Sequence, residues 1–149
     1  MISFPFRVTK AFLESPDHPI TIPMEHHYKL RDEGVVGKTD KVGATVAITV
    51  VLPDGRRFNG RIVHGEAGGK FYYQMRVPGE ASVPLCRAFA TEEFVQVVIG
   101  VVSHDVHVYL LGDRGQAYLR KFLEFKGPQA EARVLEEVGK LTRRPEALV

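Results

Sequence analysis

The chain has 149 residues, of which 44% are hydrophobic and 26% charged, and its formal net charge is +2. This composition is typical of a folded globular protein and excludes a disordered chain, and the length suits one domain with its own core. The small positive charge permits binding to a polyanion without requiring it. The longest apolar run, Val95 to Val102, is too short to cross a bilayer, and the N-terminus lacks the layout of a signal peptide. We therefore expect a cytoplasmic protein with no membrane partner.

The first forty residues predict short elements separated by loops. Residues 2–9 are rich in aromatic and apolar side chains and predict a first strand, and residues 14–19 predict a loop because they contain two prolines. Residues 20–22 predict a short strand. Pro23 suits the first position of a helix, so we expect a helix over residues 24–31, followed by a loop to residue 40.

The middle of the chain, residues 41–78, predicts a meander of three strands. Their sequences are KVGATVAITVVL, RRFNGRIVHG and KFYYQMRV. The first two are joined by Pro53-Asp54-Gly55, and Asp-Gly between apolar runs is a strong hairpin signal that predicts positive φ at both residues. The glycine-rich segment 65–69 is expected to form an exposed loop between the second and third strands.

The last third predicts a short helix at 83–90, strands at 93–103 and 106–111, and then helices at 116–125 and 130–141. The run Val97-Val98-Ile99 indicates a strand buried on both faces. The single cysteine, Cys86, excludes an intrachain disulfide, fits a reducing compartment, and is expected to be buried. The fold class is therefore mostly β with two short helices. We expect residues 1–112 to form the β domain and residues 113–149 to form a C-terminal helical hairpin that acts as an extension or connector.

No motif predicts a catalytic residue, a metal site or a cofactor. His26 and His27 are adjacent on a helix and diverge, and His104 and His107 would face opposite sides of a strand. Asp105 and His107 would share a face, but no nucleophile accompanies them. The segment HGEAGGK lacks the hydroxyl residue and the helix that a phosphate loop needs.

One row of side chains in the meander suits nucleic acid. Arg57, Asn59 and Arg61 alternate onto one face of their strand, and the next strand adds Tyr72, Gln74 and Arg76. Arginine binds phosphate or guanine through two hydrogen bonds, and asparagine can pair with adenine. A solvated sheet face with cross-strand charge pairs explains the same pattern equally well.

Two short segments carry a resemblance to a known family. These are Ile22-Pro23, which leads into a histidine-containing helix, and Asp54-Gly55-Arg56-Arg57-Phe58 at the start of the hairpin. With the order of elements, they make residues 4–102 resemble the plant B-three DNA-binding domain and its bacterial relatives, the effector domains of type II restriction endonucleases.

The resemblance implies a seven-stranded open pseudobarrel that grips the major groove of double-stranded DNA with two arms, residues 10–21 and 61–73. It implies sequence-specific binding with no chemistry of its own, and a possible linked nuclease domain that is not in this chain. The implied DNA-binding residues are Lys10, His18, Arg57, Asn59, Arg61, His64, Lys70, Tyr72, Gln74 and Arg76.

A second resemblance is to a small bacterial barrel family of unknown function. Its members share an aromatic first strand, a proline-led short helix, a glycine-rich hairpin and a late hydrophobic strand. This likeness implies a small molecule or a protein as the partner and no nucleic acid. The two alternatives differ in where the Arg and Lys residues lie, which is on the arms in a DNA reader and in a concave pocket in a ligand-binding barrel.

Overall fold

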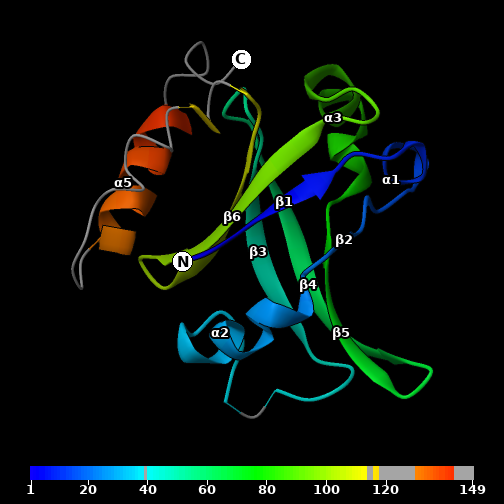
Figure 1. Cartoon of the computed structure of the whole chain (residues 1–149), viewed down its shortest axis with the longest axis vertical. Helices are drawn as coiled ribbons and strands as arrows, with labels where there is room; N and C mark the ends of the chain where they lie inside the picture. Colours follow the sequence, from blue (N-terminus) through cyan, green and yellow to red (C-terminus); the bar gives the residue numbers. More distant parts are fainter. Residues whose placement is uncertain (39, 114–115, 118–129, 143–149) are drawn as a thin grey trace.

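The structure is a computed structural model that describes residues 1–38, 40–113, 116–117 and 130–142. Within this part, seven strands form one strongly curved sheet in the order β1-β6-β7-β3-β4-β5-β2 (Figure 1). The mostly β pseudobarrel is therefore confirmed. The strands are β1 (Ile2–Arg7), β2 (Ile20–Thr21), β3 (Thr45–Val51), β4 (Arg57–Ala67), β5 (Lys70–Arg76), β6 (Phe94–Val102) and β7 (Asp105–Leu111).

The sheet has two antiparallel halves joined by one parallel contact. β3, β4, β5 and β2 pair antiparallel, as do β1, β6 and β7. The halves meet where β3 pairs parallel with β7, from Thr49 opposite His107 to Val51 opposite Tyr109. This contact joins the two antiparallel halves into a single curved surface.

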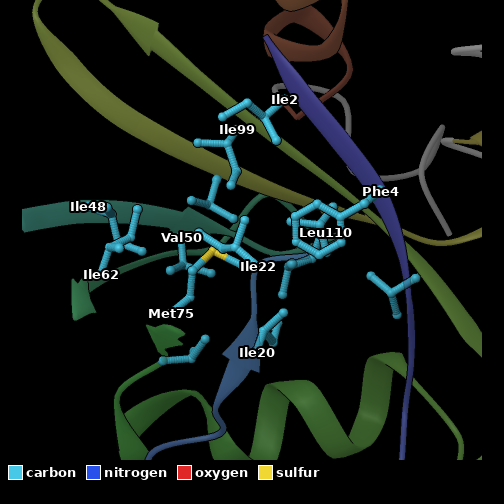
Figure 2. Packing of buried hydrophobic residues seen from close by; sticks show 14 of the residues in the cluster. Ile2, Phe4, Ile20, Ile22, Ile48, Val50, Ile62, Met75, Ile99 and Leu110 are labelled. Atoms are coloured by element: carbon cyan, nitrogen blue, oxygen red, sulfur yellow. The ribbon is translucent and has the colours of Figure 1, made fainter. Parts of the chain in front are cut away.

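The main core fills the inside of the curved sheet. Ile2 and Phe4 of β1 and Ile20 of β2, the two edge strands, belong to the same buried cluster as Ile62 and Leu110 of the central strands (Figure 2). Because both edges contribute to one core, the sheet nearly closes although β1 and β2 do not pair. Burial of this branched aliphatic surface supplies most of the driving force for folding.

A second buried cluster lies on the outer side of the sheet, beneath the C-terminal helix α5 (Ala130–Thr142) (Figure 1). Val51, Val98 and Tyr109 from three strands pack there against Val134 and Val138 of the helix. Val98 is fully buried on this side and its neighbours Val97 and Ile99 on the other, so the prediction of a strand buried on both faces is confirmed. The other predicted C-terminal helix, 116–125, falls largely outside the described residues.

Short helices cover the ends of the barrel. A 3-10 turn η1 (Met24–His26) leads into α2 (His27–Asp32), and η2 (Gly79–Ala81) leads into α3 (Ser82–Ala88), near the positions predicted. An additional helix, α1 (Lys10–Glu14), was not predicted. It begins where the Thr9 side chain accepts a hydrogen bond from the Phe12 N–H, a typical N-cap. No described helix has the length and apolar character needed to span a bilayer.

Two of the predicted turns differ in detail. At the first, Gly55 has a φ of +86° but Asp54 does not have positive φ, so the Asp-Gly pair is not the turn expected. At the second, β4 continues to Ala67, and only Gly68 and Gly69, both with positive φ, make the connection. The expected loop over residues 65–69 is therefore a tight two-residue turn, of the kind that matches the twist of a hairpin.

The prediction that Cys86 is buried is wrong, because its side chain is exposed. In α3 the buried position is Leu85, and the next residue along a helix points about 100° away from it. The apolar run 83–86 therefore lies on a helix that buries only one side.

Gly60 gives a test of how closely β4 and β5 approach. A Cβ atom at this position would lie 2.6 Å from the Arg76 carbonyl oxygen and 3.2 Å from Val50 Cγ2. We expect Gly60→Ala to lower the free energy of unfolding by about 1–3 kcal/mol, the usual cost of overpacking. Urea denaturation would measure it, with Gly37→Ala as the matched control because nothing lies within 4 Å of that position. Equal stability of the two variants would contradict the packing described here.

Candidate functional site

The outer side of the β4–β5 hairpin carries a row of polar side chains, which we call the hairpin face. Arg57, Asn59 and Arg61 are exposed, whereas Ile62 points into the core, so the alternation predicted for this strand is confirmed. The hairpin face consists of Asn59, Arg61, Tyr72, Gln74 and Arg76.

Arg57 lies apart from this group. It sits opposite Val51 at the start of β4, at the end of the strand away from the hairpin turn, and lines a hollow of about 670 Å³ with Tyr109 and with Glu136 and Lys140 of α5. The structure therefore places Arg57 beside the C-terminal helix, not beside the second arm.

Arg61 and Arg76 are directly opposite each other across the β4–β5 ladder. Like charges in this arrangement repel, but Arg76 donates a hydrogen bond of 2.6 Å to Asp17 Oδ2 and is neutralised by it. Arg61 forms no ion pair within the part of the chain that the structure describes. The charge that this pair leaves available for a ligand therefore belongs to Arg61.

The Asp17–Arg76 contact also shapes the titration of Asp17. Burial by itself would raise the pKa of the Asp17 carboxyl, but hydrogen bonds from Arg76 and Ser15 and the positive charge of Arg76 together hold its pKa below the ordinary value. The backbone strengthens the same connection, since the Val77 N–H donates to the Asp17 carbonyl at 2.8 Å. The first arm is thus fastened to the end of β5.

Gln74, Tyr72 and Lys70 follow one another along β5 toward the tip of the second arm. Gln74 Nε2 donates to Thr21 Oγ1 at 3.1 Å, which leaves its carbonyl oxygen outside that contact. Tyr72 lies across Gly65, where a Cβ atom would be only 2.2 Å from the ring. Lys70 is exposed next to the turn.

The first arm presents less to a ligand than the sequence suggested. Lys10 is exposed at the start of α1 but lies 3.8 Å from Glu14, four residues on. His18 is fully buried; its Nδ1 lies 2.8 Å from the Phe12 carbonyl oxygen and its Nε2 lies 2.6 Å from Ser82 Oγ. His18 thus ties the arm to α3, and its burial removes it from the exposed set of predicted DNA-binding residues.

His64 also points inward, and it meets residues that sequence reasoning missed. Its ring stacks on Tyr73 with centroids 4.4 Å apart. Its Nδ1 lies 2.6 Å from Asp40 Oδ2, in an ion-pair geometry and not as a straight hydrogen bond. The Tyr73 hydroxyl donates to the same Asp40 oxygen at 2.5 Å. Burial, the hydrogen bond to Asp40 and the Asp40 charge raise the pKa of Tyr73, which keeps it a hydrogen-bond donor.

These three residues lie at the base of a pocket of about 710 Å³, which we call the His64 pocket. It opens between the hairpin, α2 and the loop before β3, and its other lining residues are His27, Tyr28, Arg31, Lys41, Val42 and Phe71. The alternation of β5 indicates that Tyr73 faces inward, but nothing near Asp40 in the sequence points to His64, because the two are brought together only by the fold. No cluster of three metal-binding side chains occurs among the residues described.

Comparison with known proteins identifies the fold. No protein-family model matches the chain, and no curated protein matches it in sequence. The fold is similar to that in the structure of an Arabidopsis FUS3–DNA complex, with a TM-score of 0.50 and 12% identity over 72% of this chain and 93% of that chain. The chain therefore has a B-three-like pseudobarrel fold, as the first resemblance implied.

His18 provides a test of the first arm's attachment. We expect His18→Ala to lower the free energy of unfolding by about 2 kcal/mol, because the buried Phe12 carbonyl and the half-buried Ser82 hydroxyl would both lose their partner. Chemical denaturation followed by circular dichroism would measure the loss. A change below about 0.5 kcal/mol, as for an ordinary surface substitution, would contradict this role.

Asp17 provides a test that depends on pH. A carboxyl whose pKa is lowered by folding stabilises the protein above the pKa of the unfolded chain, and this contribution disappears as the pH falls through the folded value. We expect Asp17→Asn to lower the free energy of unfolding at about pH 6 by up to about 1 kcal/mol, since the pair is partly exposed, and to have no effect well below pH ~3.8. A difference between variant and parent that is the same at both pH values would show that the ion pair is not its source.

Proposed function

We propose that this chain binds double-stranded DNA in a sequence-specific manner and catalyses no reaction itself. The observation that carries the proposal is the hairpin face, where Arg61 has no carboxylate partner among the described residues and where Gln74 and Asn59 offer amide groups beside it. Cations set the position on the phosphates, and amides distinguish base edges. The protein with the similar fold is itself part of a DNA complex, which supports the same proposal.

In this proposal the two arms enter the major groove from either side of the hairpin face. Lys10 of the first arm and Lys70 at the tip of the second contact the phosphates, and Arg61, Tyr72 and Gln74 lie between them. Arg76 positions the first arm through Asp17 and contributes little charge to the DNA. Any cleavage of the bound DNA belongs to a separate nuclease, as in the restriction systems whose effector domains this sequence resembles.

The decisive experiment is fluorescence anisotropy with a randomised DNA duplex at two salt concentrations. We expect binding that weakens as salt rises, and we expect Arg61→Ala and Lys70→Ala each to weaken it and to reduce the salt slope by about one unit per lost phosphate contact. Arg56→Ala is the matched control, since Arg56 is exposed at the opposite end of β4 and pairs with Asp54. Absence of binding at low salt would refute the proposal. Unchanged slopes would remove Arg61 and Lys70 from the interface.

A further inference from the structure

The His64 pocket has no role in the proposed binding of a paired duplex. We infer that it is a site for one nucleotide, whose base enters between the aromatic side chains and whose phosphate stays at the rim. The nucleotide could come from a bound duplex by turning out of the stack, in which case the inference rests on the proposed function, or it could be a free nucleotide.

The size and the walls of the pocket suit a planar ring. Its volume of about 710 Å³ is within the range of small-molecule sites, which is about 300–1,000 Å³. His64 and Tyr73 form one stacked wall, and the Phe71 ring meets His64 edge-on with centroids 5.9 Å apart. Phe71 and Tyr28 stand at the opening with 57% and 62% of their surface exposed. Exposed aromatic side chains around a cavity provide stacking surfaces for a base.

The floor of the pocket offers a carboxylate, that of Asp40, to such a ring. The Asp40 side chain is only 3% exposed, and both its contacts, with Tyr73 and with His64, use the oxygen Oδ2. Oδ1 takes part in neither of them. His64 is nine-tenths buried, and its Nδ1 has no straight hydrogen bond within the described part of the chain. A carboxylate accepts readily from the amino group of cytosine, and adenine presents a similar group.

The rim of the pocket selects the charge of the ligand. An aromatic pocket with a carboxylate at its base could also take an organic cation. Here, however, Arg31 and Lys41 are exposed at the opening, and Arg31 is held there by a hydrogen bond to the Asp40 carbonyl at 3.4 Å. Two cations repel an ammonium group and attract a phosphate. A planar ring that carries an anionic group fits both the carboxylate at the floor of the pocket and the two cations at its rim.

The pocket is continuous with the second arm. Phe71 also lines a smaller hollow of about 320 Å³, together with Lys70 and Tyr72 near the hairpin turn. One side of the hairpin therefore carries the proposed phosphate and base contacts, and the other side carries the aromatic pocket. A nucleotide that leaves a duplex held on the hairpin face would be close to the opening at Phe71.

The test uses four probes with the full chain: a paired duplex, the same duplex with one central mismatch, and the free mononucleotides dCMP and dAMP. A mismatched base is easier to extrude, so we expect the mismatched duplex to bind about tenfold more tightly in anisotropy titrations. Phe71→Ala and Asp40→Asn should each abolish that gain, as well as any mononucleotide binding seen by NMR shift changes. Phe94→Ala is the matched control, because Phe94 is 58% exposed and lies outside the pocket lining.

The possible outcomes distinguish the assignment of the pocket from the proposed binding of duplex DNA. A mismatch preference lost in the pocket variants supports a nucleotide from the duplex, and mononucleotide binding lost in the same variants supports a free nucleotide. Salt-sensitive binding of the paired duplex, with no mismatch preference and no mononucleotide binding, overturns the inference and leaves the proposed function standing. Mononucleotide binding without duplex binding overturns the proposed function and leaves the pocket assigned. Phe71 is exposed, so its variant should remain folded even if Asp40→Asn does not.

Discussion

The parallel contact between β3 and β7 is the constraint on which the rest of this structure depends. Neither antiparallel half of the sheet encloses the core alone, because the main buried cluster draws on strands of both halves. Three residue pairs, from Thr49 with His107 to Val51 with Tyr109, bring the halves together and curve the sheet. Closing such a long loop is entropically expensive, and the shared burial of Val50, Ile99 and Leu110 offsets that cost.

The same contact decides which outer surface remains free. At the β3–β7 junction Val51 and Tyr109 point outward, and α5 covers them by packing Val134 and Val138 on them. Further along the sheet the outward side chains on β4 and β5 are polar, and the described helices leave them in contact with solvent. Because α5 covers one part of the outer surface and leaves the other exposed, Arg57 at the covered end of β4 is separated from Arg61, although the sequence places both in one row.

Alternation along β4 and β5 then gives the hairpin two different functional sides. Arg61 and Gln74 point outward, and His64 and Tyr73 point inward to Asp40. Because a strand reverses its side chains at every residue, a surface for phosphates and a pocket for a ring can share one ribbon only a few ångströms thick. Phe71, beside the turn, touches both hollows.

Sequence reasoning succeeded where the signal was local and failed where it was not. Strand positions followed from alternation and β-branched composition, and α5 followed from a helical stripe. The five-residue helix α1 was missed although Thr9 is a recognisable cap, because so short a segment between a strand and prolines has little periodicity. His18 and His64 read as polar surface residues, and only their partners Ser82 and Asp40, distant in the sequence, show that they are buried.

The acidic residues of the first arm illustrate how the fold changes the meaning of a charge. Considered by its charge alone, Asp17 opposes contact with a polyanion. In the structure it is bound to Arg76, and it thereby removes a cation that would otherwise repel Arg61 directly across the ladder. Asp17 therefore reduces the electrostatic cost of placing Arg61 opposite Arg76 on the hairpin face. The carboxylate thereby stabilises the hairpin, although it also cancels the attraction that Arg76 would offer to a phosphate.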